Sequence, residues 1–146
     1  MFKKHLNNER GLTLVELLAV IVILGIIAAV AVPAIGNIIE NSKVDGAKAD
    51  AIAMLNAAKL YELDGGTIDS DGVTSSELSN YLETAGTEWE TGEPVVTKDS
   101  SGTLVITGTA TGASQNVEFT NASIADINNH KSGKDGYSIG AASSGS

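Results

Sequence analysis

Residues 12–39 read LTLVELLAVIVILGIIAAVAVPAIGNII, and this stretch decides how the chain is organised. From residue 17 to residue 39 there are 23 positions without a charge. A helix of that length reaches roughly 35 Å, and the hydrocarbon core of a bilayer is about 30 Å thick. The stretch therefore predicts a helix that spans a membrane.

The charges on either side of this stretch predict its orientation. Lys3, Lys4 and Arg10 precede it, whereas the residues that follow carry no basic excess. Basic residues stay on the cytoplasmic side of a membrane. We expect the N-terminus in the cytoplasm and everything after residue 39 outside.

A secretory signal peptide also begins with basic residues and an apolar run. This run is longer than the usual apolar core of a signal peptide, and no clear small-x-small cleavage site follows it. Glu16 is also unusual, because a carboxylate costs about 2.5 to 3.5 kcal/mol at the centre of a membrane and less toward its edge. Such a residue marks a partner or a function, which a plain anchor does not need.

The segment RGLTLVELL, residues 10–18, resembles the class III signal of type IV prepilins and pseudopilins. That signal has a short basic leader ending in Gly, a hydrophobic first mature residue, Thr-Leu-Val, and Glu at the fifth position. The resemblance implies that a prepilin peptidase cuts between Gly11 and Leu12 and methylates the new Leu12 amine. Leu12 is a mild departure from the commoner Phe or Met. Gly25 and Pro33 fall where pilins often carry helix-weakening residues.

These matches suggest a mechanism of assembly. The Glu16 carboxylate can pair with the Leu12 ammonium group of a neighbouring subunit, because each charge is costly to leave alone in a low dielectric. Gly25 and Pro33 weaken the helix between them, so that a filament can stretch under load. The alternative is that both are ordinary membrane-helix residues, where Gly and Pro are tolerated.

After residue 39 the apolar pattern becomes one-sided. Apolar residues follow 3-4-3-4-3 spacing, which is typical of a helix with one covered face: Val44, Ala47, Ala51, Met54, Ala58 and Tyr61. Asp64-Gly65-Gly66 predicts the helix end by glycine capping. One helix is thus expected from residue 12 to about residue 63.

The remaining chain predicts a connector and a sheet. Residues 65–93 form the connector, with a short helix after the capping-box sequence Thr74-Ser75-Ser76-Glu77. Residues 94–140 carry strands at 94–98, 103–108 and 116–120 in an antiparallel meander, with a fourth near 137–139, before a tail at 141–146. The fold class is α+β, the lollipop that the pilin resemblance also implies. It consists of a leader (1–11), a membrane-spanning half-helix (12–39) and an amphipathic half-helix (40–64) packed on a small antiparallel sheet of 3–4 strands.

Composition excludes several classes of function. The 146 residues contain no cysteine, two histidines and a formal charge of −9, which becomes −11 once the leader loses three basic residues and one acid. We expect no nucleic acid partner, no enzyme activity and no cofactor, because His5 lies in the leader and His130 stands alone. The missing cysteine departs from many Gram-negative major pilins, which close a C-terminal loop by a disulfide.

Four acids are weak candidates for a metal. Asp69 and Asp71 match two positions of a calcium loop, but Thr67 and Leu78 stand where a carboxylate and a bidentate Glu belong. A solvated turn is the alternative, and we expect no metal. Asp126 and Asp135 carry the same weight, because some pseudopilins hold calcium through C-terminal loops.

Three further motifs have a functional and a structural interpretation. Trp89 is either an aromatic anchor in an acidic patch or an indole that plugs the core above a solvated loop; the acids are Glu83, Glu88, Glu90 and Glu93. His130, Lys131 and Lys134 form a modest basic spot that could contact DNA. Asn121-Ala122-Ser123 fits a glycosylation sequon, a pattern that is common by chance.

We expect a structural subunit of a type IV pilus-like surface filament; the apolar helix is common to filaments that serve adhesion, motility, DNA uptake or secretion. Its partners are copies of itself, a prepilin peptidase, an assembly platform with its ATPase machinery, and the membrane before assembly. One alternative is a pseudopilin of a type II secretion or competence DNA-uptake apparatus. Another is a monomeric, membrane-tethered binding module that uses Trp89.

Overall fold

The computed structural model describes residues 3–83, 87–90 and 92–140, with side chains from Leu12 onward. The chain divides into two compact units, Met1–Ile38 and Ile39–Ser146. We call the second unit the head. A long helix, α1 (Lys3–Leu63), belongs to both units.

The predicted end of α1 is confirmed. The Gly66 N–H donates to the Tyr61 carbonyl at 2.9 Å, and the Gly65 N–H donates to the Glu62 carbonyl at 3.1 Å. Gly65 has a φ of 97°, the left-handed conformation that glycine adopts without strain. These features define a Schellman motif, in which two glycines satisfy the last carbonyls of a helix.

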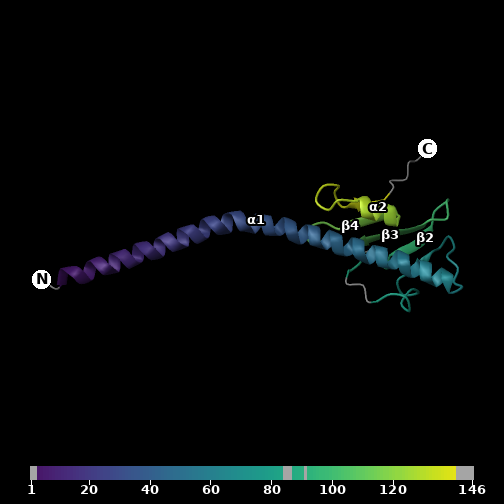
Figure 1. Ribbon diagram of the computed structural model, residues 1–146, viewed down its shortest axis with the longest axis horizontal. Coiled ribbons are helices and arrows are strands. Elements are labelled where there is room, and N and C mark those ends of the chain that lie inside the picture. The colour runs from purple at the N-terminus through teal and green to yellow at the C-terminus, as the bar shows by residue number, and fades with distance from the viewer. Residues whose placement is uncertain (1–2, 84–86, 91, 141–146) are drawn as a thin grey trace. The chain divides into compact units, whose positions relative to one another are not determined.

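The core of the head lies between α1 and the sheet, which run beside each other in Figure 1. The predicted stripe of α1 is confirmed, since Val44, Ala47, Ala51, Met54 and Ala58 are buried and Tyr61 is half-buried against Tyr81. Small alanines let the strands approach the helix closely. Sheet residues complete the cluster: Val96, Ile106, Ala110, Val117, Phe119 and Ile139.

The sheet has five strands in the order of the chain. They are β1 (Val73–Thr74), β2 (Val95–Lys98), β3 (Leu104–Ala110), β4 (Val117–Ala122) and β5 (Ser138–Ile139). The first four pair antiparallel, whereas β5 pairs parallel with β4. The α+β class is confirmed, but the expected antiparallel sheet of 3–4 strands is wrong in strand number and in its last pairing. A parallel return needs a crossover connection, and α2 (Ile124–Asn129) supplies it.

The α2 helix begins with a capping box, which fixes the start of this crossover. The Asp126 N–H donates to Ser123 Oγ at 3.3 Å, and the Ser123 N–H donates to Asp126 Oδ2 at 2.9 Å. The hydrogen bond from the Ser123 hydroxyl group and a second from its N–H hold the pKa of Asp126 below its ordinary value. Figure 1 shows α2 next to β4.

The short helix predicted after Thr74 is wrong, because the segment forms consecutive turns. One half of the expected capping box is present, since the Thr74 N–H donates to Glu77 Oε2 at 2.8 Å. The N–H groups that follow bond to carbonyls either four or three residues earlier. The Leu78 N–H donates to the Thr74 carbonyl, whereas the Tyr81 N–H donates to the Leu78 carbonyl. Pairing of Val73 and Thr74 with β2 keeps the start of the segment extended. The Glu93 carboxylate, which lies beyond the segment in sequence, accepts hydrogen bonds from the Ser76 hydroxyl group and backbone N–H. These hydrogen bonds lower the pKa of Glu93.

Candidate processing and assembly segment

The apolar segment, residues 12–39, presents its side chains outward on every side of the helix. Leu14 is 67% exposed, Ile27 57% and Val30 71%, and the other large apolar residues of the segment are exposed as well. By length and composition, α1 is the one helix among the described residues that could cross a membrane. Water does not tolerate so large a contiguous apolar surface, so lipid or other helices must cover it.

Glu16 is the only charged residue between Leu12 and Ile39, and its side chain is exposed. Leu12 and Glu16 are four residues apart in α1, so both lie on one face of the helix, one turn apart. A subunit whose chain began at Leu12 would present an ammonium group and a carboxylate on the same helix face. Gly11 lies within α1, and its surroundings are outside the part that the structure describes.

Gly25 and Pro33 do not interrupt α1, because the helix continues through both residues. A Cβ added at Gly25 would meet nothing within 4 Å. No contact with the described residues therefore requires a glycine at this position.

The candidate metal-binding acids of the head serve turns and caps. The Asp71 N–H donates to Asp69 Oδ1 at 3.0 Å, which is the bond of an Asx turn. Asp126 caps α2, and Asp135 Oδ2 accepts the Lys131 N–H at 2.7 Å. Within the described residues, no three His, Cys, Asp or Glu side chains gather as a metal-binding group.

The core-plug interpretation of Trp89 is confirmed. The indole is half-buried against the core, its ring lies 5.8 Å from that of Phe119, and residue 89 bridges Ala110 of β3. The four surrounding acids are exposed. The expected basic spot is only partly present, because His130 is 8% exposed whereas Lys131 and Lys134 are exposed.

Sequence reasoning missed Glu40 as a structural residue. Its side chain is 9% exposed, and Oε2 accepts two hydrogen bonds from Ser114, one from the N–H and one from Oγ, both at 2.9 Å. This bond fastens the loop between β3 and β4 to the first turn of the head's helix. A position directly after an apolar run was the only sequence signal, and it does not name the partner.

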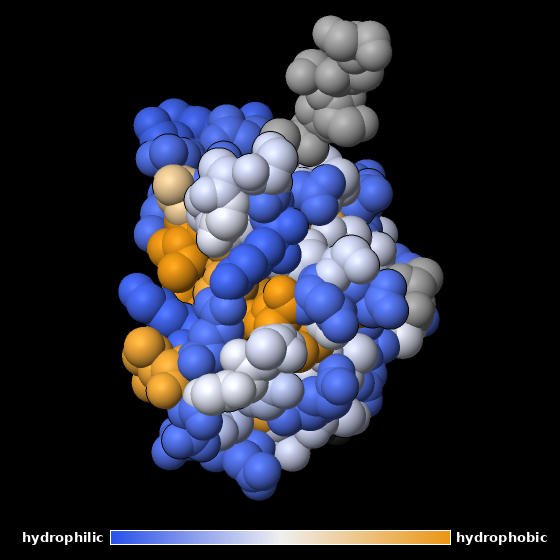
Figure 2. Space-filling model, turned by 90° about the vertical axis from the view of Figure 1, so that its right-hand side faces the viewer, coloured by the Kyte–Doolittle hydropathy of each residue, from blue (hydrophilic) through white to orange (hydrophobic). Residues whose placement is uncertain are grey.

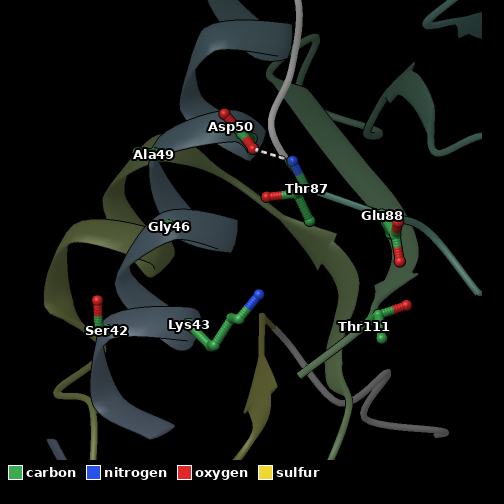
Figure 3. Close-up of a pocket in the computed structure, with 8 residues that line it drawn as sticks. All are labelled: Ser42, Lys43, Gly46, Ala49, Asp50, Thr87, Glu88 and Thr111. Atoms are coloured by element: carbon green, nitrogen blue, oxygen red, sulfur yellow. Dashed lines mark hydrogen bonds between the residues drawn. The ribbon is translucent and has the colours of Figure 1, made fainter. Parts of the chain in front are cut away.

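The head also carries a cleft of about 520 Å³ between α1 and the segments around Thr87 and Thr111 (Figure 3). The Thr87 N–H donates to Asp50 Oδ2 at 2.8 Å across it. Gly46 and Ala49 form its helical floor, and Lys43 and Glu88 are its remaining charged residues. The described residues that line the cleft mix polar and apolar surface and include neither a histidine nor a cysteine.

The end of the head shown in Figure 2 is mostly hydrophilic, with small, separate hydrophobic areas. Leu60 and Leu63, at the end of α1, are exposed large apolar residues of the head. Large apolar side chains are thus exposed along residues 12–39, whereas the face of the head in Figure 2 is mostly hydrophilic.

The chain thus combines an exposed apolar helical segment that contains one carboxylate, Glu16, with a separate head of α+β fold. The family described as "Prokaryotic N-terminal methylation motif" matches residues 6–32, which include Gly11, Leu12 and Glu16. The chain is similar to members of the type IV pilin and pseudopilin family.

Similar proteins come from both branches of that family. The chain is 43% identical over 58 residues to the type II secretion system core protein G of Pseudomonas aeruginosa, which covers 40% of this chain and 41% of that protein. It is 38% identical over 82 residues to the type IV major fimbrial protein FimA of Dichelobacter nodosus, covering 55% and 53%. A second FimA protein from that organism is 32% identical over 98 residues, covering 67% and 61%. The chain thus spans about half the length of the curated relatives it matches. No solved structure matches the chain.

Proposed function

We propose that this chain is the structural subunit of a type IV pilus-like surface filament. The observation that carries the proposal is the fully exposed apolar segment with one carboxylate, Glu16, one turn from Leu12. Copies of this segment bury one another in the filament interior, and the hydrophilic heads face water. Relatives named as major fimbrial proteins support this assignment.

In this proposal a prepilin peptidase cuts between Gly11 and Leu12 and methylates the Leu12 amine. The Leu12 ammonium group of one subunit then pairs with Glu16 of its neighbour, which sets the axial register. Before assembly the subunit spans the membrane with its N-terminus in the cytoplasm and its head outside, because Lys3, Lys4 and Arg10 precede the span. An assembly platform and its ATPase draw subunits from the membrane into the filament.

Shearing of intact cells tests this function. The released material is pelleted and examined by electron microscopy, and the same fraction is analysed by N-terminal mass spectrometry. Long thin fibres whose subunit begins at methylated Leu12 are expected. A full-length, unmethylated chain found only in membranes would contradict both processing and assembly.

A second candidate is a pseudopilin that forms a short filament inside a secretion or DNA-uptake apparatus. Relatives named type II secretion system core protein G favour it, since they are 38% to 43% identical to this chain over 58 to 64 residues. A methylated subunit without surface fibres in the shearing experiment would select this second function.

A further inference from the structure

The loop between α2 and β5, residues 130–135, packs against the first turns of the head's helix. Ser132 Oγ donates to Asp45 Oδ1 at 2.5 Å, and Lys48 Nζ donates to the His130 carbonyl at 2.8 Å. A Cβ added at Gly133 would come within 2.8 Å of Asn41 Oδ1. At 1.5 Å per residue, Asn41 and Asp45 follow Ile39 by roughly 3 and 9 Å of helix. The loop therefore lies beside the point at which the head joins the apolar segment.

The acids of this loop and helix are held by groups of the head, whereas the lysines of the loop point outward. Asp45 accepts from Ser132 and lies 3.8 Å from Lys48 Nζ, and Asp135 accepts the Lys131 N–H. Lys131 and Lys134 are exposed, and neither forms an ion pair within the described part of the chain. Their ammonium groups are available to an anionic partner.

Charge is distributed unevenly over the head. Residues 39–48 and 130–135 contain four lysines and three acids: Lys43, Lys48, Lys131, Lys134, Glu40, Asp45 and Asp135. The rest of the head has two lysines, Lys59 and Lys98, against thirteen acids. The part that joins the apolar segment is thus weakly positive, while the remainder is strongly negative. Lys43 lines the cleft together with the acids Asp50 and Glu88. Lys131 and Lys134 are not among the residues that line this cleft.

We propose that Lys131 and Lys134 bind the anionic phospholipid headgroups of the membrane that holds the subunit before assembly. The inference rests on the membrane-anchored stage of the proposed function. An acidic head tethered to an anionic bilayer is repelled by it, so the head turns its positive loop to the lipid. Each lysine near such a surface strengthens the contact roughly fivefold, and the contact breaks when the subunit leaves the membrane.

Lysine acetylation of the full-length chain tests the docking directly. The chain is reconstituted at one copy per nanodisc, either in phosphatidylcholine or in phosphatidylcholine with about one third phosphatidylglycerol. A short pulse of a water-soluble acetylating ester is followed by mass spectrometry. Labelling of Lys131 and Lys134 should fall at least about threefold in the anionic discs and recover in 1 M salt, where the Debye length is about 3 Å. Lys59, exposed near the end of α1, should label equally in both discs.

Equal labelling of the loop lysines in the two discs would overturn the docking, and so would protection that does not depend on anionic lipid. Protection that appears only with two copies per disc would assign the loop to a contact between heads instead. Elution of the chain with both discs checks the anchoring separately. A chain that fails to associate with either disc contradicts the proposed function, not only the docking.

A pair of variants with equal net charge provides the matched control. Lys131→Gln with Lys134→Gln removes the two lysines of the loop, and Lys59→Gln with Lys98→Gln removes two lysines from the rest of the head. A dye on a single cysteine, Asn128→Cys, reports proximity to a quencher attached to the lipid headgroup. The loop variant should lower the ratio of docked to undocked heads roughly 25-fold, and the control should leave it within about twofold. An equal loss in both variants would show that net charge, not the loop, governs the contact.

Discussion

Replacing Glu40 with alanine removes the acceptor that fastens the β3–β4 loop to the head's helix. Glu40 Oε2 accepts both the N–H and the hydroxyl group of Ser114, while its Oε1 is buried without a hydrogen-bond partner in the described structure. Glutamine at this position keeps an oxygen acceptor and removes the charge. The two variants therefore separate the value of the acceptor from the cost of the buried charge.

The structure gives the size of each effect. Hydrogen bonds to a charged group contribute about 1.5 to 3 kcal/mol each when both partners are buried. Ser114 is exposed, so water can replace the acceptor that the alanine variant lacks. The same variant also removes the unpaired Oε1, whose burial costs about 1 to 3 kcal/mol, and this gain partly offsets the lost hydrogen bonds. We therefore expect Glu40→Ala to lower the free energy of unfolding by about 1 to 2 kcal/mol, and Glu40→Gln by about 0.5 kcal/mol or less.

Thermal unfolding of the full chain in detergent, followed by near-UV circular dichroism of Trp89 and the tyrosines, measures the difference. At roughly 4 °C per kcal/mol for a domain of this size, the alanine variant should melt about 4 to 8 °C lower and the glutamine variant within about 2 °C. Ser114→Ala, which keeps the backbone N–H, serves as the control and should cost about 1 kcal/mol. A glutamine variant as unstable as the alanine variant would refute the reasoning, because the charge would then stabilise the head.

Four further outcomes are expected. Gly11→Asp should block processing and leave a full-length band on a gel, whereas Gly11→Ala should still be cut. Glu16→Ala should leave cleavage intact and reduce the yield of sheared filaments at least about tenfold; normal yield would contradict the pairing with Leu12. Met54→Ala, at a fully buried position, should lower the free energy of unfolding by about 2 to 5 kcal/mol in denaturant titration. The lowered pKa of Asp126 means that its capping contribution is present above about pH 4 and is lost as pH falls through that lowered pKa, so the melting difference between the chain and Asp126→Asn should shrink from pH 7 to pH 2.

The long helix and its covered face were predictable because both depend on local pattern. The 3-4 spacing from Val44 to Ala58 predicted core residues correctly, and the glycines after Asp64 predicted the end of the helix. The strands of the meander followed from runs of Val, Thr, Ile and Phe. Leu55 and Ala57 are also buried, because the covered face of the helix is wider than the single row of apolar residues that the 3-4 spacing predicts.

The remaining elements depend on contacts distant in the sequence. β1 and β5 contain two residues each, too few to show alternation, and only pairing with β2 and β4 defines them. The six-residue α2 is also too short for a periodic signal, although Ser123 and Asp126 have the spacing of a capping pair. Without this crossover, a parallel last strand could not be foreseen.

The candidate segment shows the same division. Gly11, Leu12 and Glu16 lie in one short motif of the sequence, and the family model matches residues 6–32, which include all three. The bond of Glu40 to Ser114 joins residues 74 positions apart, and that of Asp45 to Ser132 joins residues 87 positions apart. Acids and serines of this kind occur throughout the chain, so no local pattern selects these pairs.

The proposed cleavage also explains how assembly waits for processing. In the uncut chain, the nitrogen of Leu12 is part of a peptide bond to Gly11 and carries no charge. Glu16 then has no ammonium partner at the first residue of any neighbouring helix, and an apolar bundle would have to bury its carboxylate alone. Cutting after Gly11 creates the positive charge and removes the basic leader in one step. In this proposal the intact bond keeps the subunit in the membrane, and its cleavage permits helix packing.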